Sequence, residues 1–141
     1  MPVAKLDRVV LDTNILVSLI INQRADQLAD WVAEYGITFY VCPELLNELK
    51  TTFAKPDIKK YISHPTSFYI DFIKSLSVIT TISKRFDRAS DPDDNFLFDL
   101  AYTVKAYYLV TGERGLLNMK QVNKIQIISL TEFKRLVRNG V

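Results

Sequence analysis

RVVLDTNILVSLII, residues 8–21, combines a short strand signal, an acidic residue and a long apolar run. The first part, Arg8–Leu11, is short, apolar and β-branched, which predicts a strand buried on both faces. The apolar run Ile15–Ile21 predicts a buried helix directly after it. Asp12 stands between them, at the carboxyl end of the strand, where ligands bind in open α/β sheets. Asp12 is therefore a candidate site residue, and a helix cap is the alternative interpretation.

Strand and helix signals continue to alternate along the chain. Further strands are predicted over Ile37–Cys42, Ser77–Ile82, Tyr107–Thr111 and Ile125–Ser129, and helices over Asp26–Tyr35, Pro43–Phe53, Ser67–Ser77, a segment after Asp91 and a segment from Thr131. This alternation predicts an α/β fold with a parallel sheet, helices on both faces and right-handed crossovers. No repeat or long linker divides the sequence, so we predict a single domain over residues 1–141.

Composition excludes several classes of protein. The 141 residues are 48% hydrophobic and 24% charged, with a formal net charge of +2, which is typical of a globular domain without a polybasic tail. The single cysteine, Cys42, has no partner for an internal disulfide. The start of the chain does not resemble a signal peptide, and no apolar run reaches the ~18 residues that span a bilayer. We therefore predict a cytoplasmic protein without a membrane segment.

A second informative stretch is DPDDNFLFDLA, residues 91–101, where acidic residues crowd at the start of an apolar helix. Such crowding costs repulsion unless a cation neutralises it, which favours a metal site. A capped helix is an equally good interpretation from this stretch alone, since Asp91 followed by Pro92 is a favourable helix start.

The helical wheel of this stretch separates its acids. Asp93 and Asp94 fall toward the apolar face formed by Leu97 and Leu100, whereas Asp99 falls opposite. We therefore expect Asp99 to be exposed and Asp94 to face the core edge.

Two more acids have a suitable position. Glu48 flanks the apolar stripe of its predicted helix, while Glu44 points nearly opposite and is expected to be solvated. Glu113 lies just past the strand Tyr107–Thr111, on the same sheet edge as Asp12. If those two strands are neighbours, four acids gather in one crevice: Asp12, Glu48, Asp94 and Glu113.

Clustered carboxylates are typical of a site for a hard divalent cation such as Mg²⁺, which prefers oxygen ligands and keeps several waters. One or two ions would suit hydrolysis of a phosphodiester. Asp12 and Asp94 are the predicted direct ligands, with Glu48 and Glu113 as ligands or holders of metal-bound water. Four residues are candidates to orient these acids by hydrogen bonds: Thr13, Asn14, Asn95 and Thr111.

The densest basic cluster is Lys84, Arg85 and Arg88, just before the aspartate stretch. These side chains are candidate contacts for a phosphodiester near the metals. A solvated loop is the alternative.

Four segments in this order resemble PIN-domain ribonucleases: VVLDTNILVS (residues 9–18), PELLNEL (43–49), DPDDN (91–95) with Ala101, and LVTG (109–112). The resemblance covers nearly the whole chain. It is strongest to stand-alone bacterial and archaeal PIN proteins that act as toxins in type II (VapC-like) toxin–antitoxin pairs. It implies a three-layer α/β/α sandwich with a roughly five-stranded parallel sheet in the order 3-2-1-4-5.

The resemblance also implies chemistry and partners: Mg²⁺ or Mn²⁺, an RNA substrate, a homodimer, and a cognate antitoxin that blocks the acidic crevice. The family's first three acids fall on Asp12, Glu48 and Asp94, the last of these seven residues before Ala101. The fourth falls on Glu113, where the family usually has aspartate, and Gly115 stands where a second aspartate is often found.

These departures leave open a catalytically weakened or inactive PIN module that binds RNA or a protein partner. A haloacid-dehalogenase-like phosphatase is a weaker alternative. Its chemistry needs an aspartate two positions after the first one, and Asn14 stands there.

Overall fold

The computed structural model describes residues 7–87, 89 and 91–139. The strands are β1 (Arg8–Leu11), β2 (Thr38–Val41), β3 (Ser77–Ile79), β4 (Tyr108–Val110), β5 (Gln121–Val122) and β6 (Ile125–Ile128). The helices are α1 (Thr13–Ile21), α2 (Ala25–Tyr35), α3 (Pro43–Phe53), α4 (Pro56–Lys59), α5 (Thr66–Ser75), the 3₁₀ helix η2 (Pro92–Asp94), α6 (Asn95–Thr103), α7 (Arg114–Leu117) and α8 (Leu130–Arg138). None of the helices in these ranges is long and apolar enough to cross a membrane.

The six strands form one sheet in the order β3-β2-β1-β4-β6-β5. The first five run parallel, and only β5 pairs antiparallel, with β6. The predicted order 3-2-1-4-5 is confirmed, because its fifth strand corresponds to β6. The extra strand β5 was not predicted, since two residues are too short to show a periodic pattern.

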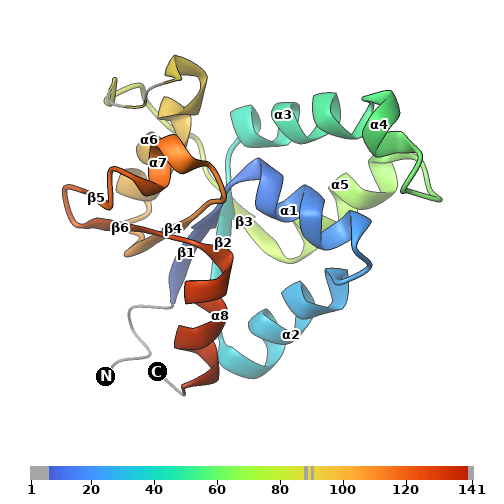
Figure 1. Ribbon diagram of the computed structural model, residues 1–141, viewed down its shortest axis with the longest axis horizontal. Helices are drawn as coiled ribbons and strands as arrows, with labels where there is room; N and C mark the ends of the chain where they lie inside the picture. The colour runs from blue at the N-terminus through green and yellow to red at the C-terminus, as the bar shows by residue number, and fades with distance from the viewer. Residues whose placement is uncertain (1–6, 88, 90, 140–141) are drawn as a thin grey trace.

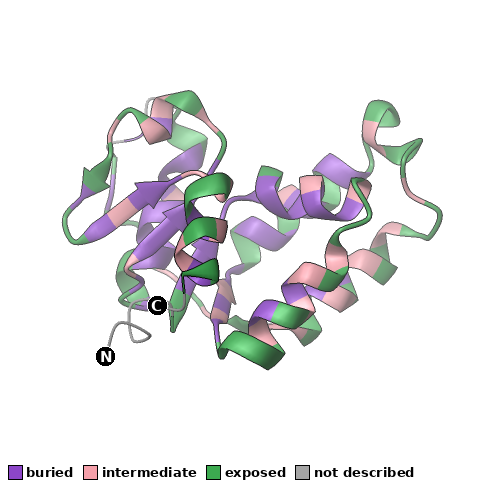
Figure 2. Ribbon diagram, turned by 60° about the horizontal axis from the view of Figure 1, so that its bottom comes forward, coloured by how far each residue is buried: buried purple, intermediate pink, exposed green. Residues whose placement is uncertain are grey.

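Helices cover both faces of this sheet, as Figures 1 and 2 show. The chain moves outward from β1 to β2 and β3, then returns to β4 on the other side of β1, so right-handed crossovers place α1 to α5 on one face and α6 on the other. Helix α6 packs against β1, β4 and β6. The three-layer α/β/α architecture is therefore confirmed.

Local signals fix the helix ends. Gly36 ends α2 in the left-handed conformation with φ 66°, which a glycine adopts without steric cost. Pro43 occupies the first turn of α3, where its missing N–H costs nothing. Helix α8 begins with a capping box in which Ser129 and Glu132 satisfy each other's backbone N–H groups.

The edge strand β3 is shorter than predicted. It ends at Ile79 rather than Ile82, and the side chains of Val78 and Ile79 are about half exposed, at 46% and 50%. The backbone N–H of Thr80 still donates to the carbonyl of Val41, at 2.8 Å. Beyond that bond the segment leaves the sheet, which the β-branched sequence alone does not indicate.

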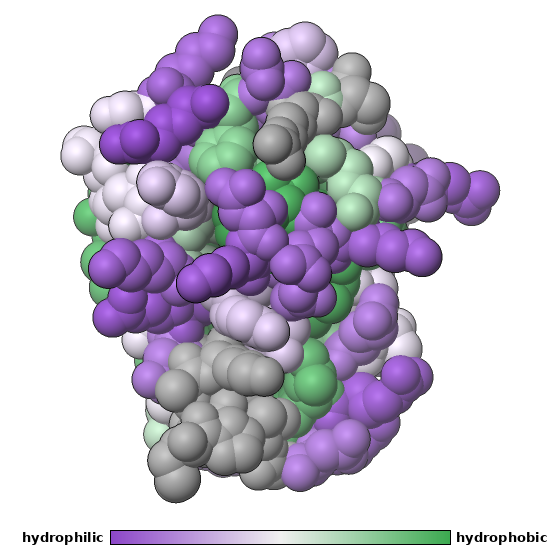
Figure 3. Space-filling model, turned by 90° about the vertical axis from the view of Figure 1, so that its left-hand side faces the viewer, coloured by the Kyte–Doolittle hydropathy of each residue, from purple (hydrophilic) through white to green (hydrophobic). Residues whose placement is uncertain are grey.

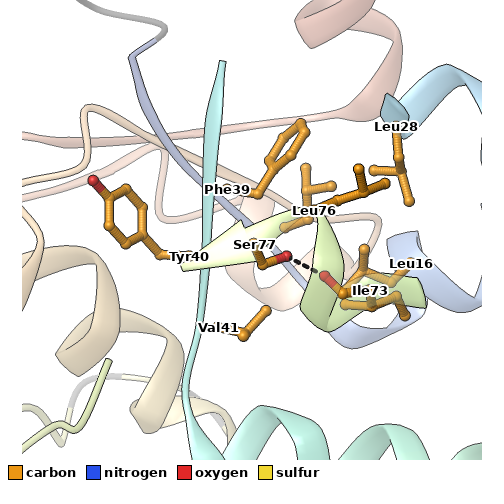
Figure 4. Close-up of a pocket in the computed structure, with 9 residues that line it drawn as sticks. Leu16, Leu28, Phe39, Tyr40, Val41, Ile73, Leu76 and Ser77 are labelled. Carbon is orange, nitrogen blue, oxygen red and sulfur yellow. Dashed lines mark hydrogen bonds between the residues drawn. The ribbon is translucent and has the colours of Figure 1, made fainter. Parts of the chain in front are cut away.

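A small cavity of about 10 Å³ lies in the core where β2 and β3 meet α1, α2 and α5. Figure 4 shows its apolar lining, which includes Leu16, Leu28 and Phe39. The only dashed bond in that view runs from the Ser77 hydroxyl to the carbonyl of Ile73, at 2.7 Å. The cavity has room for about one water molecule and is a packing gap in the core.

Three aromatic rings attach α8 to the face of the sheet that α2 covers. Phe133 of α8 meets Trp31 of α2 edge-on, with ring centroids 5.1 Å apart, and Phe39 of β2 at 6.4 Å. Phe133 is fully buried. This cluster fastens the last helix to the sheet through contacts that are distant in sequence.

Replacing Phe133 by alanine should lower the free energy of unfolding by about 3–5 kcal/mol, because the cavity left behind cannot collapse among three elements. Urea denaturation followed by circular dichroism measures this change. Phe68→Ala is the matched control, since its ring is 51% exposed, and it should cost about 1 kcal/mol or less. Equal losses in the two variants would contradict the role given to the aromatic cluster.

Candidate active site

Asp12 lies at the carboxyl end of β1, next to the end of β4. Its backbone N–H donates to the carbonyl of Val110 at 2.9 Å, and its side chain is only 2% exposed. The hydroxyl of Thr111 donates to the Asp12 carboxylate at 2.7 Å and accepts the backbone N–H of Glu113 at 3.0 Å. One buried threonine therefore links the acids that follow β1 and β4.

The electrostatic surroundings of Asp12 are dominated by other acids. Burial raises the pKa of its carboxyl group, and repulsion from Glu48 and Glu113 raises it further. The hydrogen bonds from Thr111 and from the backbone of Asn14 act in the opposite direction. The carboxylate is thus held by two donors in a strongly negative setting.

Asp94 reaches the same edge from the start of α6. The carboxylate of Asp91 accepts the backbone N–H of Asp93 at 3.0 Å, which caps η2 as the sequence indicated. Burial, a hydrogen bond shared with the carboxyl group of Glu113, and repulsion from Glu113, Asp12 and Asp91 raise the pKa of Asp94 to about 8. The acids around Asp94 therefore disfavour the charged form of its carboxyl group.

The four predicted acids interact in pairs. Glu48, half-buried on α3, acts on Asp12, while Glu113 acts on both Asp12 and Asp94. Within residues 7–87, 89 and 91–139, no three His, Cys, Asp or Glu side chains are arranged as a ligand set for one ion. Paired carboxylates still fit the donor chemistry of Mg²⁺, which is usually bound by one or two carboxylates and several waters.

Thr13 supplies a further observation beside Asp12. Its hydroxyl is buried and has no hydrogen-bond partner in the described part of the chain. A buried hydroxyl normally has a partner, so this group is suited to hold a water next to the acidic pair. The oxygen-only donor set and this orphaned hydroxyl both fit a hydrated divalent cation.

Two of the residues expected to orient the acids do something else. The side-chain oxygen of Asn95 accepts the backbone N–H of Ala89 at 2.9 Å, which fixes the loop before η2. Asn14 is exposed and contributes through its backbone N–H, as described above. Among the four candidates, Thr111 is the one whose side chain contacts a predicted acid.

Two expectations from the helical wheel are wrong. Asp93 is exposed, because η2 is a 3₁₀ turn and its residues do not follow the α-helical wheel. Asp99 is buried, with 3% exposure, and its carboxylate accepts the backbone N–H groups of Arg85 at 2.8 Å and Phe86 at 3.0 Å. The loop before η2 covers this side of α6. The sequence signal that could have indicated the burial of Asp99 was an acidic residue in mid-helix beside an irregular segment.

Lys84 and Arg85 of the predicted basic cluster lie in different surroundings. Lys84 lines a hollow of about 250 Å³ together with Asp93 and Asn95, beside the acidic edge. Arg85 turns away, and its guanidinium lies 5.2 Å from the ring centre of Tyr102. Arg88 lies outside the described residues.

Asp94→Asn should stabilise the metal-free protein in a pH-dependent way. Because folding raises the pKa of Asp94 from 3.8 to about 8, the contribution of its carboxyl group to the free energy of unfolding is most favourable below about pH 4. This contribution is lost as the pH rises through 8. The melting temperature of the variant should therefore lie on the order of 5 °C above that of wild type at pH 9 and should equal it at pH 4, as measured by calorimetry with chelator. Asp93→Asn, at the exposed neighbour, is the control, and an equal pH dependence in both variants would contradict the assignment.

Comparisons with known proteins agree with this geometry. The family model described as PIN domain matches residues 8–115, which include all four acids. A protein of Methanocaldococcus jannaschii named "Uncharacterized protein MJ1680" is 30% identical over 121 residues, covering 83% of this chain and 77% of that protein. PIN domains are generally nucleases and typically use divalent metal ions. This chain belongs to the PIN-domain family.

Proposed function

We propose that this protein is a metal-dependent endoribonuclease that hydrolyses RNA phosphodiester bonds with one or two Mg²⁺ or Mn²⁺ ions. The observation that carries the proposal is the gathering of Asp12, Asp94 and Glu113 at one sheet edge, where Thr111 links Asp12 to the backbone of Glu113 and the neighbouring acids raise the pKa of Asp94. Buried acids that repel one another destabilise the fold, so their concentration here favours a cationic ligand.

The acids have distinct roles in this proposal. Asp12 and Asp94 would hold the cation directly, and Glu48 and Glu113 would serve as further ligands or accept hydrogen bonds from its waters. When bound, such a cation supplies an acidified water and neutralises charge that develops on the phosphate. The buried carboxylates supply the fixed negative charges that select a cation for this edge.

Thr111 acts as a positioning residue. Its hydroxyl donates to Asp12 and counteracts the effect of burial on the pKa of that carboxyl group. By accepting the N–H of Glu113 it also fixes the start of the turn after β4. The charged form and the orientation of Asp12 therefore depend on this hydroxyl together with the backbone N–H of Asn14.

We extend the proposal to the biological setting on the strength of the resemblance to toxin components. The protein would act in the cytoplasm as a homodimeric toxin, and a cognate antitoxin would neutralise it by covering the acidic edge. RNA would be its substrate, with Lys84 beside the acids as a phosphate contact.

A second candidate is a weakened or inactive PIN module that binds RNA or a protein partner. Glu113 and Gly115 in place of aspartates favour this candidate. Against it, the carboxyl group of Glu113 reaches Asp94 closely enough to share a hydrogen bond, so the extra methylene does not remove this acid from the edge. Activity therefore remains the better supported function.

Asp12→Asn should reduce RNA cleavage at least a thousandfold, because the substitution removes a proposed cation ligand while keeping the size of the side chain. The assay uses a labelled single-stranded RNA and total RNA with Mn²⁺ or Mg²⁺, and with EDTA. Glu34→Gln, an exposed acid on α2, is the control and should cleave like wild type. Cleavage that survives EDTA or Asp12→Asn would refute the proposal, and no cleavage by wild type with either metal would favour the binding module.

Thr111→Val should lower kcat about 10–100-fold, since it removes the hydroxyl that orients Asp12 and leaves the volume nearly unchanged. The acidic limb of the pH–rate profile should also move to higher pH, because Asp12 loses a hydrogen bond that favours its charged form. Thr111→Ser keeps the hydroxyl and should restore most of both properties. A Thr111→Val profile identical to wild type would exclude this role.

A further inference from the structure

A large pocket, of about 670 Å³, lies at the sheet edge opposite the acids. It is formed by the end of α6, the turn that leads into β4, and the tip of the β5–β6 hairpin. These segments precede β4 and β6, whereas Asp12 and Thr111 follow β1 and β4. Helix α6 has nine residues and so separates its acidic start from this pocket by roughly 13 Å. Figure 3 shows this side of the molecule, where long hydrophilic side chains surround strips of hydrophobic surface.

The charge of the pocket is one-sided. Arg85, Lys105 and Lys124 line it, and none of the described residues in its lining is acidic. Three cations around one concave site, on a protein whose net charge is only +2, produce a local field that attracts an anion. The chemistry of this edge is thus opposite to that of the acidic edge.

Two tyrosines supply flat surfaces inside this basic rim. Tyr102 is 46% exposed, and its ring is held edge-on by buried Phe86 at 5.6 Å and faced by the Arg85 guanidinium at 5.2 Å. Tyr107 also lines the pocket and meets the ring of Tyr108 edge-on at 5.0 Å. Because buried neighbours fix both rings, they are preorganised for stacking against a planar ligand.

The loops that carry the cations are ordered by their own hydrogen bonds. Lys105 has a positive φ of 58°, and its N–H donates to the carbonyl of Tyr102 at 3.1 Å. Asn123, at the hairpin tip, has a positive φ of 52°, and its carbonyl accepts the side-chain amide of Gln121 at 2.7 Å. The side-chain amide of Asn123, at the pocket wall, offers both a donor and an acceptor.

We propose that this pocket binds a nucleotide, either free or as one unit of an RNA chain, with its phosphate near Lys105 and Lys124 and its base against the tyrosines. A simple phosphate would need neither the volume nor the aromatic rings, and a neutral apolar ligand would leave three cations without partners. The volume falls within the range of small-molecule sites. The proposal does not depend on cleavage at the acidic edge.

The test measures binding with EDTA present, so that RNA stays intact and the result is independent of nuclease activity. Titrations of AMP, inorganic phosphate and a fluorescein-labelled RNA hexamer are followed by calorimetry or fluorescence anisotropy. The pocket variant is Lys105→Asn with Lys124→Gln, since asparagine tolerates a positive φ. The matched control, Lys59→Gln with Lys74→Gln, removes the same charge from exposed positions on α4 and α5.

We expect the pocket variant to weaken binding at least tenfold and the control to weaken it less than twofold at moderate salt. Pocket-dependent binding of AMP identifies a free nucleotide, and pocket-dependent binding of the hexamer without AMP identifies a unit of RNA. Tyr102→Leu should also weaken either ligand severalfold while the thermal transition is preserved. Phosphate that binds as tightly as AMP and the hexamer, equal loss in both double variants, or no binding of either nucleotide ligand would overturn the proposal.

Discussion

The hydrogen bond between Thr111 and Asp12 is the contact on which the candidate site depends. It joins residues 99 positions apart in sequence, and it exists because β1 and β4 are adjacent parallel strands that end together, with Leu11 paired to Val110. A parallel sheet whose order reverses at β1 leaves a crevice at this edge. Any loss of register between these strands would separate the acids, so the chemistry of the sheet edge depends on the stability of the central sheet.

The acids at this edge oppose folding, and the rest of the molecule offsets their cost. Burial and mutual repulsion raise the pKa values of Asp12 and Asp94, which means that their charged forms are disfavoured in the folded chain. The sheet beneath them is apolar on both faces, with Val9, Val10 and Leu109 fully buried. A rigid hydrophobic support can hold a strained polar edge, which is the usual division between the scaffold and the functional site of an enzyme.

Sequence reasoning succeeded where a residue's role follows from its neighbours in the chain. The Gly36 and Pro43 helix ends and the placement of Asp12 after β1 follow from local patterns, whereas the strand order followed from the resemblance to PIN-domain proteins. It failed for the burial of Asp99, which depends on a segment that packs from elsewhere, and for β5, whose two residues are too short to show a periodic pattern. Asp99 is polar and lies opposite the apolar face of its helix, yet the loop around Phe86 covers it and uses its carboxylate. Helical periodicity alone cannot show that a helix is covered on two sides.

Helix α6 connects the two chemically distinct edges of the molecule. Its start carries Asp94 and the end of the helix leads into Lys105, so acids lie at the positive end of the helix dipole and a cation at its negative end. This arrangement stabilises the helix and also separates charge across the domain: an acidic edge suited to cations and a basic, aromatic edge suited to nucleotides. Since the Asp99 carboxylate anchors the backbone of Arg85 to α6, one helix fixes both the acid at its start and the stacked guanidinium near its end. A change in the packing of α6 would therefore alter both edges together, whereas a change at Asn123 or Lys124, at the tip of the β5–β6 hairpin, would act on the basic edge.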